Sequence, residues 1–252
     1  MLRLLFIFAC LGLAPGLAAI AEDLVKQGLA AEARLETGEA LRLFLAADRL
    51  KPEDAFILQK IARQYSDSVV DAPDPEEKKR LAQTALDFAL RAVQLEPDNP
   101  ENVLSLAVCH GKLAVYSDTR TKIEYSRLIK EDAERALALD PQYDWAHHVL
   151  GRWHYEVASL GSATRLFVRL VYGGLPAASN AAAISHLERA VALAPQTVAH
   201  HLELGFAYLE AGRKPDARAA FERGLALPSK EKHDEDAKAR ARRALGRMAA
   251  SA

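Results

Sequence analysis

The chain has 252 residues, with 33 Lys and Arg against 34 Asp and Glu, so its net charge of -1 offers no electrostatic attraction for nucleic acid. Half of the residues are hydrophobic, which argues against a disordered chain, and only 7% are aromatic. Because alanine and leucine dominate, the composition favours helices over sheets. The two cysteines, Cys10 and Cys109, are too few for a disulfide framework.

The first 21 residues have the layout of a secretory signal peptide. Arg3 precedes an apolar run over residues 4–14, and an Ala-x-Ala pattern ends at Ala21. We expect cleavage after Ala21 and a mature domain over residues 22–252. Since the composition favours Arg over Lys and is rich in Ala, we expect a bacterial protein exported to the periplasm. The alternative is an uncleaved segment that anchors the chain, and only then would we expect membrane association.

The remainder of the chain repeats one unit. Five segments end in a similar pattern of alanine or glycine, leucine and then proline, and the leucines are Leu50, Leu95, Leu139, Leu193 and Leu227. The last two leucines are 34 residues apart, which is the length of a tetratricopeptide repeat. Proline ends a helix, and the small residues allow two helices to approach closely. The pattern therefore predicts a series of helical hairpins.

We predict an all-α fold, an α-solenoid of about five tetratricopeptide-like hairpins. In chain order the hairpins cover roughly residues 22–54, 55–99, 100–143, 144–197 and 198–229. The charged segment 232–250 is expected to form a C-terminal capping helix, because a terminal repeat needs a polar outer face. The fourth hairpin contains an insertion over residues 159–180, whose centre is apolar and ends in Gly-Gly-Leu-Pro.

Several motifs in the second half of the chain point to a family. They are Lys122-Ile123, Ile129-Lys130-Glu131, Leu150-Gly151-Arg152-Trp153 and Tyr172-Gly173-Gly174-Leu175-Pro176. With these motifs, the chain from about Val103 to Pro228 resembles the regulator of microtubule dynamics family of tetratricopeptide-like proteins. The resemblance implies a helical-repeat fold and an adaptor role. Eukaryotic members of this family look like membrane-tethered or mitochondrial adaptors associated with microtubules, and one branch is linked to phospholipid binding.

Motifs for phosphate binding, dinucleotide binding, acyl transfer and zinc proteases do not occur, so we expect no enzyme, no catalytic residues and no cofactor. The chain has eight histidines. His147 and His201 occupy the same repeat position, where an aromatic side chain packs between helices, so we interpret them as structural. A metal site built on His147 and His154 is the less favoured interpretation, and we expect none.

The first helices of such a solenoid line its concave side. Projection of the repeat assigns six side chains to a candidate binding groove: Arg63, Lys112, Trp145, His148, Arg152 and Tyr155. The same projection adds Phe56, Gln59, Asn102, Ser105 and Cys109, although a lone cysteine is more often a small buried side chain. Cations suit carboxylates, and Trp and Tyr offer contact area, so we predict a protein or peptide partner. Alternatively, Trp145 and Tyr155 pack against the apolar insertion, which must bury its apolar face.

The apolar insertion 159–180 suggests a second function. A groove covered by this segment could hold an acyl chain, with its anionic headgroup near Arg152, Arg165 or Arg169. The alternative to a peptide-binding scaffold is therefore a carrier of phospholipid or another amphiphile. A buried apolar groove would favour the carrier, whereas an open and charged groove would favour the peptide scaffold.

Overall fold

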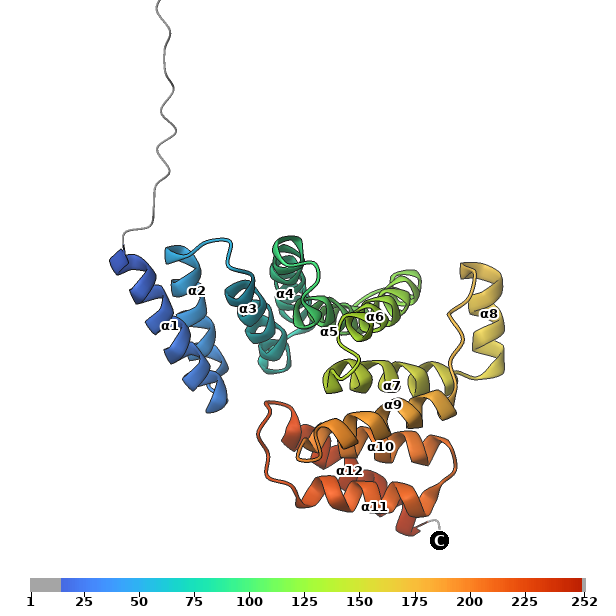
Figure 1. The fold of residues 1–252 in the computed structure, drawn as a ribbon. Coiled ribbons are helices and arrows are strands. Elements are labelled where there is room, and N and C mark those ends of the chain that lie inside the picture. The colour runs from blue at the N-terminus through green and yellow to red at the C-terminus, as the bar shows by residue number, and fades with distance from the viewer. Residues whose placement is uncertain (1–14, 251–252) are drawn as a thin grey trace, which may run out of the picture.

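The computed structural model describes residues 15–250, and this part of the chain consists of helices joined by short loops, without a strand (Figure 1). The helices are α1 (Pro15–Ala33), α2 (Thr37–Leu50), α3 (Ala55–Ser68), the 3-10 helix η1 (Val69–Asp71), α4 (Pro75–Leu95), α5 (Pro100–Val115), α6 (Thr119–Leu139), α7 (Asp144–Ala158), α8 (Ser162–Tyr172), α9 (Asn180–Leu193), α10 (Val198–Glu210), α11 (Lys214–Ala226) and α12 (Asp234–Ala250).

The helices pack in pairs. The pairs are α1 with α2, α3 with α4, α5 with α6, α7 with α9, and α10 with α11. Successive pairs stack on one another and curve into an arch, and α12 packs against α10 and α11 at its end (Figure 1). The predicted all-α solenoid of helical hairpins is therefore confirmed.

The helix ends follow from the sequence pattern. The second helices of the first four pairs end at Leu50, Leu95, Leu139 and Leu193, the leucines of the repeated pattern. Proline follows each leucine at the second position, where it cannot continue the helix. Two of the helices that follow, α3 and α5, begin at side-chain caps; for example, Asp54 accepts a hydrogen bond from the backbone N–H of Ile57.

Small residues bring paired helices into close contact. A Cβ atom at Gly205 would lie 2.5 Å from the ring of Phe221, and one at Gly28 would lie 2.7 Å from the ring of Phe44. Both phenylalanine side chains are completely buried. Glycine is therefore required at equivalent places in the first and last hairpins, because any larger residue would push a core ring aside.

The N-terminal helix crosses the predicted processing site. Helix α1 begins at Pro15 and continues through Ala21, which is completely buried. Residues 1–14 of the predicted signal peptide lie outside the described residues, and cleavage after Ala21 stays a prediction. Within residues 15–250, none of the helices is both long and apolar enough to cross a bilayer.

The insertion of the fourth hairpin contains a helix of its own. Its apolar centre forms α8, which stands at the edge of the arch beside α6 (Figure 1). Helix α8 ends at Gly173, whose positive φ of 79° is a left-handed conformation that glycine adopts without strain. An extended segment then leads back to α9.

Candidate functional site: the concave surface

The six candidate side chains come from the first helices of three neighbouring hairpins. Arg63 lies on α3, Lys112 lies on α5, and the other four candidates lie on α7. Together with Glu32 on α1 and Glu203 on α10, the three cations Arg63, Lys112 and Arg152 form a row that crosses the first helices. We call this row the concave surface.

Trp145 and His148 of α7 pack against the following hairpin. The Nδ1 atom of His148 lies 3.0 Å from the Nδ1 atom of the fully buried His200, and Nε2 of His200 donates to Asp144 at 2.9 Å. The ring of Trp145 lies 5.0 Å from that of His148 and 4.8 Å from that of His200. Burial and the neighbouring His200 hold the pKa of His148 well below its ordinary value. Trp145 and His148 therefore join α7 to α10 by packing against His200.

Tyr155 also makes an internal contact. Its hydroxyl donates to Oε2 of Glu203 at 2.5 Å, and Arg240 of α12 donates to the other carboxylate oxygen at 3.1 Å. Glu203 is only 4% exposed, so these two donors and nearby Arg152 are its polar surroundings. Burial, and then the charge of Glu203, raise the pKa of Tyr155. The Tyr155 hydroxyl thus connects the fourth hairpin to the fifth and, through Glu203, to the capping helix.

The two arginines of the candidate set have carboxylate partners. Arg63 lies 3.1 Å from Glu32 and 2.6 Å from Glu231. Arg152 donates to Glu156 at 2.7 Å along its own helix. Burial lowers the pKa of Arg152, but the charges of Glu203 and Glu156 outweigh burial and raise it overall.

Lys112 differs from the other cations of the concave surface. Its side chain is partly buried and forms no ion pair within residues 15–250. Burial lowers the pKa of Lys112, while the carboxylate of Asp67 opposes this effect and the charge of Arg152 adds to it. Lys112 and Arg152 are therefore two neighbouring cations, and an anion between them would reduce their repulsion.

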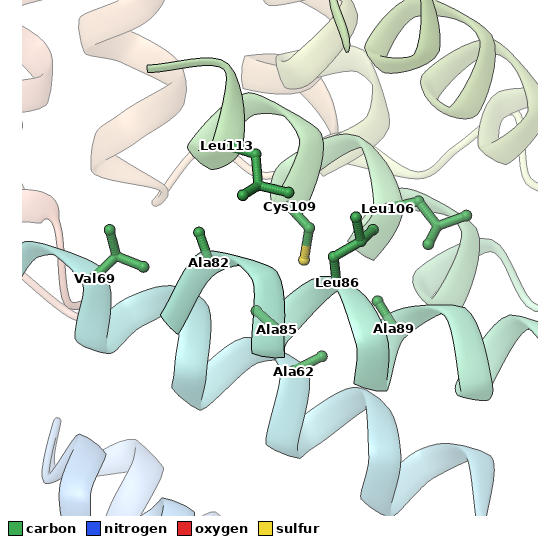
Figure 2. Packing of buried hydrophobic residues seen from close by; sticks show 9 residues of the cluster. All are labelled: Ala62, Val69, Ala82, Ala85, Leu86, Ala89, Leu106, Cys109 and Leu113. Atoms are coloured by element: carbon green, nitrogen blue, oxygen red, sulfur yellow. The ribbon is translucent and has the colours of Figure 1, made fainter. Parts of the chain in front are cut away.

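Two further side chains that the sequence projection assigned to the groove lie elsewhere. Asn102 is buried and donates to the backbone carbonyl of Ala92 at 3.4 Å. Cys109 is 2% exposed in the cluster that joins α3, α4 and α5, among alanines that include Ala85 (Figure 2). Their assignment to the groove was wrong because the face of α5 that carries both residues packs against the preceding hairpin, whereas the expectation that Cys109 is a small buried residue is confirmed. Burial raises the pKa of its thiol to about 12.

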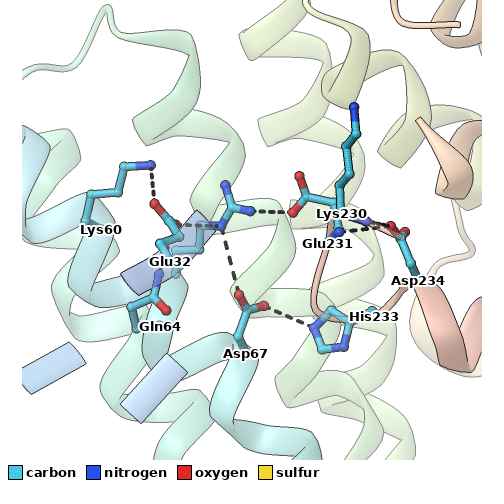
Figure 3. Close-up of polar contacts among 9 residues, drawn as sticks. Glu32, Lys60, Gln64, Asp67, Lys230, Glu231, His233 and Asp234 are labelled. Atoms are coloured by element: carbon cyan, nitrogen blue, oxygen red, sulfur yellow. Dashed lines mark hydrogen bonds and ion pairs between the residues drawn. The ribbon is translucent and has the colours of Figure 1, made fainter. Parts of the chain in front are cut away.

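An unpredicted set of contacts links the second hairpin to the loop before α12. Glu231 accepts from Arg63 at 2.6 Å, His233 lies 3.0 Å from Asp67, and Lys232 lies 2.8 Å from Asp71. Figure 3 shows Glu231 and His233 reaching toward the α3 side chains. We call these three contacts the clamp.

The clamp connects parts of the arch that lie far apart in the sequence. Arg63 and Glu231 are 168 residues apart, and a cleft of about 210 Å³ lies beside them. The loop is shaped by the buried Asp234, whose carboxylate accepts from the backbone N–H groups of Lys230 and Glu231. The clamp therefore ties the last layer of the solenoid to its second hairpin.

A family model described as regulator of microtubule dynamics protein 1-3 matches residues 20–249. The chain belongs to this family. It is 29% identical over 182 residues to regulator of microtubule dynamics protein 1 of Bos taurus, covering 71% of this chain and 57% of that protein. It is 31% identical over 157 residues to regulator of microtubule dynamics protein 3 of Xenopus laevis, covering 62% and 34%. The chain thus spans less than two thirds of either relative.

Solved structures show the same fold. A thermophilic tetratricopeptide-repeat protein of Thermus thermophilus superposes with a TM-score of 0.64 at 21% identity, covering 89% of this chain and 98% of that one. MamA of Desulfovibrio magneticus RS-1 superposes with a TM-score of 0.50 at 17% identity, covering 86% and 97%. The chain therefore has a tetratricopeptide-like helical-repeat fold.

Residues of the motifs that resemble the family form hydrogen bonds between the fourth hairpin and the third. The indole N–H of Trp153 donates to the backbone carbonyl of Ser126 at 2.7 Å. One residue further along α6, Arg127 donates to the carbonyls of Tyr172 and Gly174. The contacts of Trp153, Tyr172 and Gly174 therefore position the insertion and α8 against α6, whereas Arg152 of the same motifs belongs to the concave surface.

The histidines of the fourth and fifth hairpins make structural contacts. His147 and His201 each lie close to the carbonyl oxygen of the proline six residues earlier, at 3.2 Å and 2.9 Å, which is the structural role expected from their shared repeat position. His154 and His186 stack with ring centroids 5.8 Å apart, and Nδ1 of His147 lies 3.0 Å from Nδ1 of His186. Within residues 15–250, no group of three or more potential ligands is placed to hold a metal ion.

Proposed function

We propose that this protein is a non-catalytic scaffold whose concave surface binds an acidic segment of a protein or peptide partner. The observation that supports the proposal is the pair of neighbouring cations Lys112 and Arg152, of which Lys112 has no carboxylate partner within residues 15–250. The cost of burying an ammonium group without a partner is reduced when an anion binds beside it. A carboxylate of the partner would supply that anion.

The other candidates support this site indirectly. Trp145, His148 and Tyr155 are committed to contacts with α10, so they fix the position of α7 and hence of Arg152. Arg63 lies at the clamp and limits the concave surface at its N-terminal side. The cationic centre at Lys112 and Arg152 is short, because Arg63 is already paired with Glu32 and Glu231, and this favours a short acidic segment over a continuously acidic chain.

The alternative function, a lipid or amphiphile carrier, has one observation in its favour, the exposed apolar face of α8. The charged row of the concave surface favours the peptide scaffold instead. Native mass spectrometry of protein purified without detergent separates the two. A mass excess that extracts as phospholipid would support the carrier, and an apo mass would support the scaffold. The proposal includes export to the periplasm and cleavage after Ala21. The same mass measurement tests the cleavage, because a cleaved chain lacks the mass of residues 1–21.

Site-specific photo-cross-linking tests the scaffold in intact cells. A photoreactive residue at Val108, four residues before Lys112 on α5 and 39% exposed, samples the same helix face. The matched control is Leu90 on α4, which is 43% exposed. We expect a cross-linked partner from position 108 that Lys112→Glu abolishes and Lys112→Arg preserves. A product that is equally strong from position 90, or that persists with Lys112→Glu, would overturn the proposal.

A further inference from the structure

Helix α8 exposes a continuous apolar stripe. Leu166 and Leu170 are four residues apart, as are Phe167 and Val171, so the four side chains share one face of the helix. Leu170 is 74% exposed, and each of the other three is more than half exposed. Such a patch on a soluble domain marks an interaction site.

The structure holds this stripe away from the body of the protein. Val168, on another face of α8, is buried. At the end of the helix, Arg127 of α6 donates to the carbonyls of Tyr172 and Gly174, the second at 2.6 Å. Helix α8 is therefore fixed at one end, while its apolar stripe remains open to the surroundings.

The charges around α8 identify the kind of partner. Between Glu156 and Glu188 the chain contains no acidic residue, whereas Arg165 and Arg169 lie on α8, are exposed and form no ion pair within the described part of the chain. Across a cleft of about 450 Å³, α6 contributes Arg120, Glu124 and Arg127, and Glu124 is 3.3 Å from Arg120. The surroundings of the stripe are thus positively charged.

We propose that α8 inserts its apolar stripe into the surface of a membrane that contains anionic lipids. An amphipathic helix with Leu and Phe on one face and arginines beside it lies in the plane of the headgroups, where both kinds of side chain find partners. With 11 residues and about 1.5 Å per residue, α8 is too short to cross a bilayer. A second copy of this chain fits less well. Two such stripes in contact would bring the arginines of both copies together, and the segment between Glu156 and Glu188 has no carboxylate to pair with them.

The test uses a signal that arises only at α8, so that membrane binding elsewhere in the full chain does not imitate it. Tryptophan is introduced by Phe167→Trp, with Leu90→Trp on α4 as the matched control, and the wild-type spectrum is subtracted. Vesicles of phosphatidylcholine with or without phosphatidylglycerol are added, and lipids brominated along the acyl chains serve as quenchers. We expect a blue shift and quenching for Phe167→Trp only, and only with the anionic vesicles.

Further substitutions separate the apolar and the charged contributions. In the Phe167→Trp background, Arg165→Ala and Arg169→Ala should each weaken the response to anionic vesicles about fivefold. Leu166→Glu with Leu170→Glu should abolish it, with an unchanged circular dichroism spectrum because both side chains are exposed. No spectral response at position 167, an equal response with uncharged vesicles, or self-association that the two glutamates abolish without any vesicle response would each overturn the proposal.

Discussion

The clamp predicts a specific loss of stability when Arg63 is replaced. Arg63→Met removes the cation that joins Glu32 on α1 to Glu231 in the loop before α12. Glu32 keeps Lys60 as a partner at 3.2 Å, so Glu231 is the carboxylate that loses its cation. Breaking a buried ion pair from one side costs about 3–5 kcal/mol. Because Arg63 is 40% and Glu231 37% exposed, we expect about 1–3 kcal/mol.

The assay is urea unfolding of Arg63→Met, Glu231→Gln and the double variant at neutral pH. If Arg63 and Glu231 interact as the structure shows, the sum of the losses of unfolding free energy in the two single variants exceeds the loss in the double variant by about 1 kcal/mol. Burial raises the pKa of Glu231, and the charge of Arg63 opposes this. Without Arg63, the folded-state pKa of Glu231 rises further, so the stability deficit of Arg63→Met should shrink as the pH falls toward that pKa and the carboxyl becomes neutral.

A second readout reports the shape of the arch. Small-angle scattering should show a larger radius of gyration for Arg63→Met, because the last layer loses one of its three contacts with the second hairpin. A free energy of unfolding within about 0.5 kcal/mol of the wild type, together with additive single losses, would show that the clamp contributes nothing and would refute this reasoning.

Further predictions concern the core and its titration. Gly205→Ala should destabilise the fold by about 1–2 kcal/mol, since the added Cβ would meet the Phe221 ring. Gly111→Ala should stabilise it by up to about 1 kcal/mol, because the added Cβ meets only an atom at 3.9 Å. Chemical unfolding of both variants shows the sign of each change. With a pKa of about 12, Cys109 should react with a thiol reagent only after unfolding, as peptide mapping would show, and reaction in the native protein would contradict its burial. Burial lowers the pKa of His148 and that of His186, the latter to about 4, so the folded state resists protonation of both. Stability should therefore fall by about 1–2 kcal/mol per histidine between pH 7 and pH 5, and a pH-independent free energy of unfolding would contradict this.

The fold could be predicted from local signals. Proline follows Leu50, Leu95, Leu139 and Leu193 and ends a helix at each place, because it cannot continue the helical hydrogen bonds. Glycine opposite a buried ring is required where two helices pack closely. Both effects act between residues close in sequence, so one chain is enough to reveal them. The same periodicity assigned Lys112 to the groove of the solenoid, and that assignment stays a prediction.

The remaining features depend on contacts between distant residues. Nothing in the sequence around Glu231 indicates that it meets Arg63, because only the curvature of the intervening hairpins brings the two together. The buried pair of His148 and His200 depends on how α10 is rotated against α7, and the position of Asn102 depends on which face of α5 packs against the preceding hairpin. The periodicity of the sequence shows which residues share a helix face, but the packing between neighbouring hairpins decides which face is buried.

The central claim is that a carboxylate of the partner binds beside Lys112. Measuring the pKa of Lys112 tests this claim most directly. The lysines are labelled by reductive methylation with 13C, Lys112 is assigned by comparison with Lys112→Arg, and the pKa is measured with and without a glutamate-rich peptide. We predict that Lys112 titrates below its ordinary value of 10.5 in the free protein and that the peptide raises its pKa. A Lys112 that titrates with the exposed lysines and does not respond to the peptide would contradict the claim.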